Sequence, residues 1–394
     1  MQEVFMYRIR IYNNVSKEGL AGLEERFEET DRLKHADCAI VRSTSLHNKV
    51  FPDNFLAVAR AGAGVNNIPV DRCSAEGIVV FNTPGANANA VKELVLTGLL
   101  MAARNVPEAL SWVKNLKGDV EEQVEKHKGK FTGFEVMSKT IGVVGLGAVG
   151  VQVANAAEDL GMKVLGYDPY ITVDSAHSLS NTIPVCKDMS AVIAESDYIT
   201  IHVPFMKETE GLLNKNHFQK AKDGLCVLNF ARSGLVNEDD ILELLDKGKI
   251  SKYITDFPAE RILGHPGVIC FPHLGACTAE SELNCSRMAS MQLADYMING
   301  NIKNSVNLPD CDLGRIHTAA RISILNKNIA GMLGIITGIL ADMRINISDL
   351  INKSKGDMAY TLIDIDSSVD EEALRRSLKR DGIISVRLLF PESD

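Results

Sequence analysis

The sequence predicts an α/β protein with three parts: a doubly wound parallel sheet, a second parallel α/β domain into which it is inserted, and a small C-terminal module. Three observations predict this class. Short apolar runs alternate with helix-compatible stretches between residues 7 and 271. A glycine-rich turn joins a strand to a helix near residue 145. From residue 321 the order becomes strand, helix, strand, strand, helix, strand within about 75 residues.

Four short apolar runs between residues 7 and 83 predict the strands of the first domain: R-I-R-I-Y, C-A-I-V-R-S, L-A-V-A-R-A-G and I-V-V-F-N-T. Turn-rich or helix-compatible stretches separate these runs, as in a small parallel, flavodoxin-like domain. Ligands gather at the carboxyl ends of parallel strands. The polar residues and glycines that follow these strands therefore mark a candidate binding edge: Arg42, Ser43, Arg60, Gly62, Gly64, Asn82 and Asn87.

A G-x-G-x-x-G spacing lies between a predicted strand at 140–144 and a helix at 149–160. Gly145 permits a tight turn, Gly147 lets the backbone approach a pyrophosphate, and Gly150 lets helix and strand pack closely. A second strand at 163–167 ends on Asp168, 18 residues after the last glycine. This carboxylate can bind an adenosine ribose and would repel a 2′-phosphate, so the motif predicts a Rossmann-type site for NAD.

Further strands near 199–203, 226–230, 253–257 and 268–271 complete the doubly wound domain, and Arg232, Glu260 and His273 follow the last three. Hydride removal from a hydroxy acid needs an anchor for the carboxylate and a base for the hydroxyl proton. Arginine can bind a carboxylate through two hydrogen bonds, and histidine can take a proton near neutral pH. A carboxylate beside the histidine would orient its ring and favour its charged form. The three residues are therefore candidates for catalysis.

A helix at 281–299 and the connector N-G-N-I-K-N-S-V-N-L-P return the chain towards the first domain. We therefore expect a substrate-binding lid domain made of residues 1–88 and 280–308. The NAD-binding domain is expected at 89–279 and a ferredoxin-like module at 318–394. The charged segment before the glycine turn is expected to be a solvated helix.

The composition is that of a globular protein, with 45% hydrophobic and 24% charged residues among 394. A net charge of −9 opposes general attraction to nucleic acid or anionic membranes. The eight cysteines form no C-x-x-C pair and no zinc spacing, so we expect no metal site and a reducing compartment. The N-terminus lacks the pattern of a signal peptide and no apolar run reaches about 18 residues, so we expect a cytoplasmic protein.

The chain resembles the D-isomer-specific 2-hydroxyacid dehydrogenases, and within that family the branch that ends in an ACT domain. The resemblance covers nearly the whole chain and rests on F-N-T-P-G-A-N-A-N-A-V-K-E-L, V-G-L-G-A-V-G, L-N-F-A-R-S-G-L-V-N-E, T-D-F-P-A-E and P-H-L-G-A. It implies a homodimer or homotetramer that uses NAD to oxidise 3-phospho-D-glycerate to 3-phosphohydroxypyruvate, the first step of serine synthesis.

The resemblance also implies roles for individual residues. Arg232, Glu260 and His273 would be catalytic. Arg42, Ser43, Gly62, Gly64 and Asn87 would bind the substrate, with Arg42 the leading candidate for its phosphate. The implied NAD-binding residues are Gly145, Gly147, Ala148, Val149, Gly150, Asp168, His202, Val203, Pro204, Ala231, Asp256 and Gly275.

The acid in this chain departs from the family pattern. The family usually places the catalytic acid five positions after the aspartate, whereas Glu260 follows Asp256 by four and the fifth position is Arg261. We choose Glu260 and infer a one-residue deletion, since an arginine beside His273 would disfavour the charged ring.

Two further departures concern the phosphate and a thiol. Thr44 stands where a basic residue is frequent, so the phosphate is expected to depend on Arg42, Arg60 or a neighbouring subunit. Cys277 replaces a frequent serine, and we expect a buried, unreactive thiol rather than a regulatory one.

An ACT domain commonly binds an amino acid at a subunit interface. The positions that match serine contacts in related dehydrogenases are Asn326, Asn328 and Asn346, while Ala330 replaces a frequent proline. Inhibition by serine and assembly without regulation are both open.

Three alternatives to the phosphoglycerate reaction remain. Another family member could act on glycerate, lactate or 2-hydroxyglutarate. A formate dehydrogenase is disfavoured, because that branch uses glutamine in place of the acid. A corepressor that senses NAD would be a binding module, but the complete Arg-Glu-His set, the ACT-like tail and the lack of a basic tract favour an enzyme.

Overall fold

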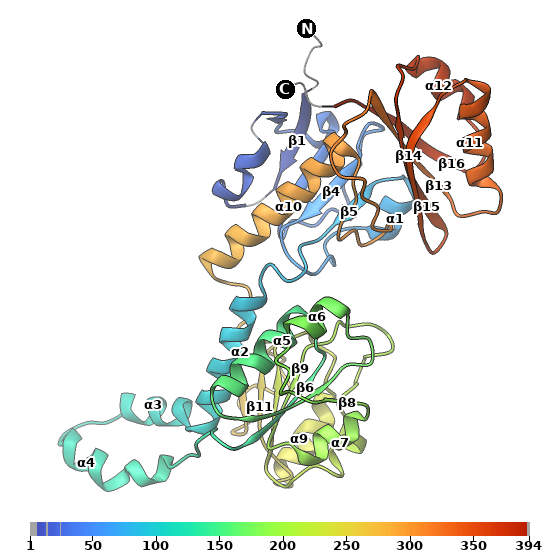
Figure 1. Cartoon of the computed structure of the whole chain (residues 1–394). Helices are drawn as coiled ribbons and strands as arrows, with labels where there is room; N and C mark the ends of the chain where they lie inside the picture. The colour runs from blue at the N-terminus through green and yellow to red at the C-terminus, as the bar shows by residue number, and fades with distance from the viewer. Residues whose placement is uncertain (1–5, 13–14, 24, 392–394) are drawn as a thin grey trace. The chain divides into compact units, whose positions relative to one another are not determined.

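The structure is a computed structural model that describes residues 6–12, 15–23 and 25–391 (Figure 1). The first five residues, on which part of the signal-peptide expectation rests, lie outside this range. Packing divides the chain into two units: unit 1 is Met1–Ala86 with Glu282–Asp394, and unit 2 is Asn87–Ser281. None of the described helices has the length and apolar character to cross a membrane.

Unit 1 begins with a parallel sheet whose strand order is β2-β1-β3-β4-β5 among the described residues, the flavodoxin-like arrangement. Its strands and short helices are β1 (Tyr7–Ile11), η1 (Glu18–Leu23), β2 (Phe27–Glu29), η2 (Leu33–His35), β3 (Cys38–Val41), β4 (Ala57–Arg60), α1 (Val70–Ala75) and β5 (Val79–Phe81). Strand β2 was not predicted, because F-E-E offers one apolar residue and no alternation.

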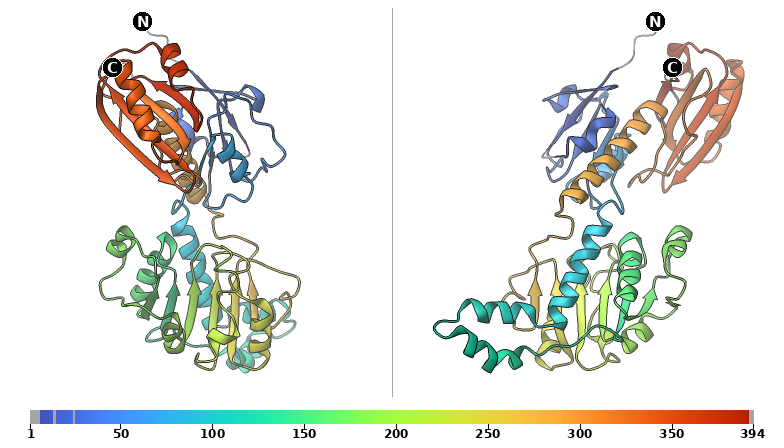
Figure 2. Two further views of the ribbon diagram at one scale, coloured as in Figure 1. Left: turned by 90° about the vertical axis from the view of Figure 1, so that its right-hand side faces the viewer. Right: turned by 60° about the vertical axis from the view of Figure 1, so that its left-hand side comes forward.

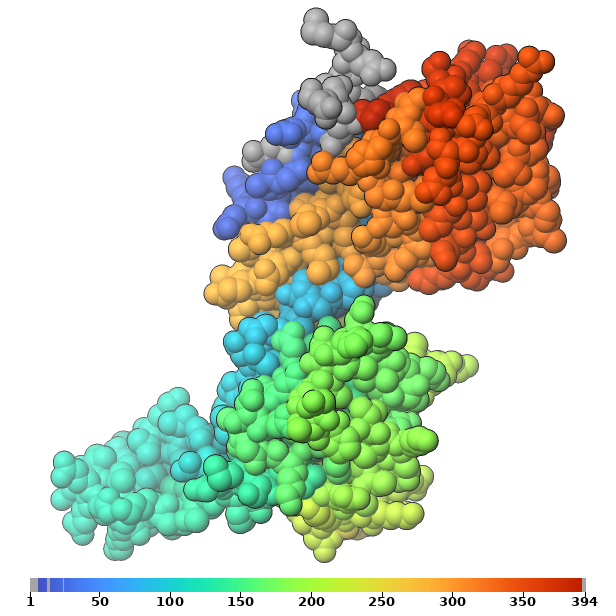
Figure 3. All heavy atoms as spheres, in the orientation of Figure 1, coloured from blue at the N-terminus to red at the C-terminus, as the bar shows by residue number. Residues whose placement is uncertain are grey.

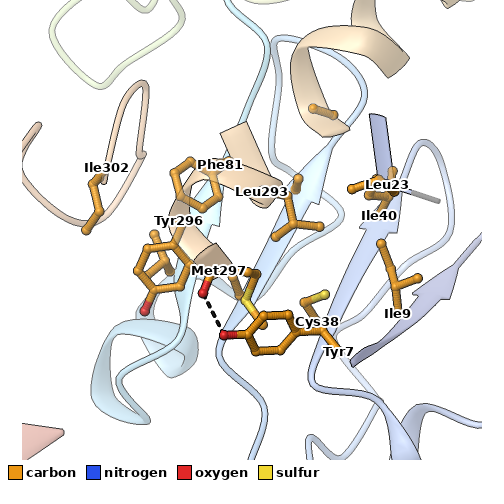
Figure 4. Packing of buried hydrophobic residues seen from close by; sticks show 14 of the residues in the cluster. Tyr7, Ile9, Leu23, Cys38, Ile40, Phe81, Leu293, Tyr296, Met297 and Ile302 are labelled. Carbon is orange, nitrogen blue, oxygen red and sulfur yellow. Dashed lines mark hydrogen bonds between the residues drawn. The ribbon is translucent and has the colours of Figure 1, made fainter. Parts of the chain in front are cut away.

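The two faces of this sheet are covered by different helices. Cys38 and Ile40 point to the core that contains α10 (Ala279–Asn299), whereas Ala39 and Val41 belong to the core on the α1 side. This alternation is the period of two that a strand imposes on its side chains. In the first core the hydroxyl of Tyr7 donates to the carbonyl oxygen of Met297 at 2.8 Å (Figure 4).

The C-terminal module, residues 320–391, has the predicted βαββαβ order and an antiparallel sheet ordered β14-β15-β13-β16. Its elements are β13 (Ala320–Lys327), α11 (Met332–Asp342), β14 (Ile347–Lys355), β15 (Met358–Ile365), α12 (Glu371–Ser377) and β16 (Ile383–Leu389). Both helices cover one face of the sheet (Figure 2). From the opposite face Leu325, Tyr360 and Leu362 enter the core that holds α10.

Unit 2 contains a parallel sheet with the order β12-β11-β10-β9-β6-β7-β8 among its described residues, so the predicted doubly wound fold is confirmed. Helices α2 and α5 pack on one face, and α7, α8 and α9 on the other. The strands are β6 (Thr140–Val144), β7 (Lys163–Tyr167), β8 (Val185–Cys186), β9 (Tyr198–Ile201), β10 (Leu225–Asn229), β11 (Ile250–Thr255) and β12 (Val268–Cys270). The helices are α2 (Ala88–Ala103), α5 (Ala148–Asp159), α6 (Val173–Ser178), α7 (Met189–Glu195), α8 (Lys215–Phe218) and α9 (Glu238–Asp246).

A helical hairpin projects from unit 2 as a separate lobe (Figure 3). It consists of α3 (Val106–Lys114), α4 (Val120–His127) and η3 (Lys128–Phe131). The predicted solvated helix is α4, which buries none of its residues. Trp112 packs against Phe131 inside the hairpin, while Leu110, Val113 and Val120 are exposed apolar side chains on it.

Candidate active site

The order of the large sheet reverses between β6 and β9, and the first candidate residues follow these two neighbouring strands. Gly145 comes directly after β6 and His202 directly after β9. A Cβ added to Gly145 would lie 2.7 Å from the carbonyl carbon of His202. In doubly wound sheets such a reversal opens the crevice that takes a dinucleotide.

The three motif glycines differ in what surrounds them. Gly145 has φ +94°, and a Cβ on Gly150 would lie 1.9 Å from the carbonyl oxygen of Gly145, so the fold itself requires both. A Cβ on Gly147 would meet no atom of the described residues within 4 Å. The open space at Gly147 therefore fits a phosphate group, beside the N–H groups of Ala148 and Val149 in the first turn of α5.

Asp168 follows β7 and is bonded to the glycine turn. Its Oδ2 accepts from the backbone N–H of Leu146 and its Oδ1 from that of Tyr170, each at 2.8 Å. The carboxylate therefore braces the turn in addition to its predicted role at the ribose. Both oxygens have further lone pairs for a ribose hydroxyl.

His202 is held in its neutral form. Burial lowers the pKa of His202 to about 3, and its Nε2 lies 2.9 Å from the hydroxyl of Thr200. A neutral ring suits the predicted place beside an adenine. Val203 and Pro204, predicted for the same pocket, follow His202 in the loop after β9. Val203 packs close to the glycine turn, since a Cβ added to Gly145 would lie 2.9 Å from its Cγ1.

The loop that carries Ala231 and Arg232 is shaped by Asn229, the buried last residue of β10. Asn229 accepts from the N–H of Ala231 at 3.2 Å and donates to the carbonyl oxygen of Arg232 at 2.9 Å. The Arg232 side chain is exposed and donates to the carbonyl oxygen of Ala231 at 2.6 Å. Sequence reasoning missed Asn229; its signal is a polar residue that closes the apolar strand L-C-V-L-N.

Asp256 shapes the loop that presents His273. It is buried, and its two oxygens accept from the N–H groups of Leu274 and Gly275, each at 2.8 Å. His273 itself has φ +58°, an uncommon conformation that these hydrogen bonds help to hold. Its exposed ring stands edge-on to Phe257, with 5.2 Å between the centroids.

Glu260 and Arg261 have different surroundings. Arg261 is paired with the buried Glu238 at 2.7 Å and with Asp239 at 3.3 Å. Glu260 is exposed, and no hydrogen bond or ion pair joins it to His273 in the described part of the chain. Arg232, Glu260 and His273 thus follow adjacent strands β10, β11 and β12 without bonding to one another.

In unit 1 the predicted substrate residues surround the ends of β3 and β4. Arg42 is paired with Glu282 of α10, and Ser43 follows it. The guanidinium of Arg60 lies over Gly62, where an added Cβ would be 2.7 Å from its Nη1. Gly64 lies in the same loop, which Asn82 holds through the carbonyl oxygen of Ala63 at 2.7 Å.

Asn87, also predicted to bind substrate, lies in unit 2 as the N-cap residue of α2.

The expectation of a buried Cys277 is wrong, because this thiol is exposed. Its loop leaves the sulfur at the surface, 3.6 Å from the carbonyl oxygen of His273.

The three candidate effector residues do not meet within one copy of the module. Asn326 and Asn328 lie at the end of β13, and Asn346 precedes β14. Asn326 is opposite Ala359 of β15, whereas Ile347 is opposite Ile365, six residues further along that strand. This register separates Asn346 from Asn326 by about 20 Å along the sheet.

The doubly wound sheet of unit 2, with its glycine turn at the carboxyl ends of the strands, is that of a known class of nucleotide-binding domain. The family model "D-isomer specific 2-hydroxyacid dehydrogenase, NAD binding domain" matches residues 96–275. The chain belongs to the D-isomer-specific 2-hydroxyacid dehydrogenases, and this segment is the NAD-binding domain of the family.

Several relatives of this chain are D-3-phosphoglycerate dehydrogenases. That of Methanocaldococcus jannaschii is 30% identical over 362 residues, 89% of this chain and 67% of the relative. That of Archaeoglobus fulgidus is 36% identical over 266 residues, 66% of this chain and 48% of the relative. The chain thus spans about half to two thirds of the length of these relatives.

A solved structure of the NAD⁺-bound 3-phosphoglycerate dehydrogenase of Entamoeba histolytica is 27% identical, with a TM-score of 0.60. The match covers 77% of this chain and 99% of that one.

Proposed function

We propose that this protein is an NAD-dependent dehydrogenase that oxidises 3-phospho-D-glycerate to 3-phosphohydroxypyruvate, the first step of serine synthesis. One observation carries the proposal: adjacent strands bring the glycine turn, Arg232, Glu260 and His273 to one edge of the sheet. The names of the relatives support this substrate over glycerate, lactate or 2-hydroxyglutarate.

Each residue in the proposed reaction has one task. NAD, when bound, accepts the hydride from the carbon that bears the hydroxyl. Arg232 binds the substrate carboxylate, and His273 takes the hydroxyl proton. Glu260 stabilises the positive charge that forms on the His273 ring. Asp256 keeps the His273 loop in place through the N–H groups of Leu274 and Gly275.

Steady-state kinetics with NAD test the substrate. We expect kcat/KM for 3-phospho-D-glycerate to exceed that for D-glycerate, D-lactate and D-2-hydroxyglutarate. His273→Asn should lower kcat by about 10²–10⁴-fold while NAD still binds, because it removes the proton acceptor. The exposed His177→Asn in the same unit serves as the control. Equal use of all four acids would reject the substrate, and full turnover by His273→Asn would favour the corepressor alternative.

We also propose assembly into a homodimer or homotetramer and an effector role for the C-terminal module as an ACT domain. The buried Oδ1 of Asn326 has no hydrogen-bond partner among the described residues, which supports a polar ligand such as serine there. Because Asn346 is about 20 Å away along the sheet, its contribution would come from a second copy beside the edge strand β14.

The free cysteines are consistent with a proposed cytoplasmic location.

A further inference from the structure

We propose that Glu282 is an internal counter-ion that holds Arg42 until the substrate phosphate displaces it. This carboxylate would then set how strongly the enzyme prefers phosphorylated over unphosphorylated hydroxy acids. The inference rests on the proposed function, because Arg42 is the residue expected to bind the phosphate.

The contact is a direct ion pair between two elements of unit 1. Nη1 of Arg42, after β3, lies 2.5 Å from Oε1 of Glu282, in the first turn of α10. The side chains are 30% and 40% exposed, respectively. A pair this open to water is weak, so a dianion that competes for the guanidinium can displace the carboxylate.

The backbone of Arg42 does not depend on this ion pair. Its carbonyl oxygen accepts from Nε of Arg60 at 3.1 Å and from Nδ2 of Asn67 at 3.4 Å. Asn67 also donates to the carbonyl oxygen of Thr44 at 2.9 Å. Loss of the ion pair therefore frees the guanidinium for a ligand without loosening the loop that carries it.

The position of Glu282 is fixed by the packing of α10. The hydroxyl of Ser286 accepts from the N–H of Ser16 at 3.2 Å, and that of Ser290 donates to the carbonyl oxygen of Gly19 at 2.6 Å. A Cβ on Gly19 would come within 2.5 Å of Cβ of Ser286, so helix and loop are in close contact. Release of Arg42 therefore requires rotation of the Glu282 side chain and no shift of the helix.

The charges decide the direction of the effect. Arg42 and Glu282 together carry no net charge, and a phosphate dianion near them is attracted by one and repelled by the other. Removing the carboxylate leaves a positive site. Glu282→Gln should therefore strengthen the binding of phosphorylated substrate and leave the reacting end of the molecule untouched.

The experiment compares Glu282→Gln with wild type for 3-phospho-D-glycerate and D-glycerate. We expect KM for the phosphorylated acid to fall about three- to fivefold, with kcat changed less than about twofold, as for the loss of one exposed ion pair. KM for D-glycerate should not change. Glu280→Gln, two residues earlier on α10, is the matched control, because no ion pair joins Glu280 to a described residue. In an Arg42→Met background Glu282→Gln should have no such effect on KM.

A second measurement separates this inference from the proposed function. Inorganic phosphate should raise the Tm of Glu282→Gln more than that of wild type, whether or not the protein turns over 3-phospho-D-glycerate. A rise in KM in Glu282→Gln, an equal change for both acids, or an equal phosphate effect on Tm would overturn the counter-ion role. The wild type could fail to turn over 3-phospho-D-glycerate while phosphate still raises the Tm of Glu282→Gln more than that of wild type. That result would reject only the proposed reaction.

Discussion

Individual buried polar residues at strand ends determine how the candidate catalytic residues are presented. Asn229 and Asp256 each use both polar atoms of the side chain on the backbone of a loop beyond their strand. Asp256, the residue after β11, reaches across 18 or 19 positions in sequence to the loop after β12. The geometry at His273 therefore depends on a residue that is itself buried.

The choice between Glu260 and Arg261 is a residue-level prediction. If Glu260 supports the charge on His273, Glu260→Gln should lower kcat roughly 10- to 100-fold, a part of what general acid–base catalysis contributes, without weakening NAD binding. Steady-state kinetics and NAD titration measure the two effects.

Arg261→Ala is the matched variant for that comparison. It should change kcat less than about twofold but lower the free energy of unfolding, because it leaves the buried Glu238 without its partner. The reverse pattern, with kcat sensitive to Arg261 and indifferent to Glu260, would show that the inferred deletion is misplaced.

The sequence predicts which residues end the strands but not which loops they hold. Gly145, Gly150 and Asp168 were predictable because the spacing of their motif reflects a local turn. The Arg261–Glu238 pair spans 23 positions and the Arg42–Glu282 pair joins β3 to α10, so neither contact leaves a local pattern. Exposure of Cys277 likewise depends on the loop conformation after His273 rather than on residue type.

At the scale of elements, the C-terminal turn of α10 is capped by side chains from other elements. Arg387 donates to the carbonyl oxygens of Tyr296 and Met297, and its guanidinium lies over the Tyr296 ring. Arg321 donates to the carbonyl oxygen of Asn299 and Tyr360 to that of Gly300. Two cations at a helix C-terminus also complement its dipole. The C-terminal module is thereby bonded to the helix that covers the N-terminal sheet.

Arg321 should be the most sensitive of these caps. It is fully buried and binds both oxygens of the buried Asp364, at 2.5 and 2.9 Å. Arg321→Met leaves that carboxylate unpaired and should cost about 3–5 kcal/mol of unfolding free energy in denaturant titrations. Arg375→Met, which breaks the exposed pair with Glu371 in the same module, should cost about 0–1 kcal/mol. Equal losses of unfolding free energy in Arg321→Met and Arg375→Met would show that the buried Arg321–Asp364 pair contributes no more stability than the exposed pair.

At the scale of the whole molecule, one shared hydrophobic core joins two parts of unit 1 that the sequence suggests are separate domains. Phe81 of the N-terminal sheet, Tyr296 of α10 and Tyr360 of the C-terminal module belong to the same buried cluster. The large sheet of unit 2 has separate cores on its two faces. The periodicity of the sequence predicted the βαββαβ order of the module, but it gave no sign that the second face of that sheet packs on α10.

This division predicts two thermal transitions that respond to different perturbations. NAD is expected to bind the glycine turn in unit 2, so at about 100 times its Kd it should stabilise that unit by about 2.7 kcal/mol. For a unit of this size each kcal/mol shifts Tm by about 2–4 °C, which calorimetry resolves. Arg321→Met should lower the other transition, because the N-terminal sheet, α10 and the module share one core. If NAD and Arg321→Met instead shifted a single common transition, the two units would unfold together. If Arg321→Met split a third transition from unit 1, the module would unfold by itself despite the shared core.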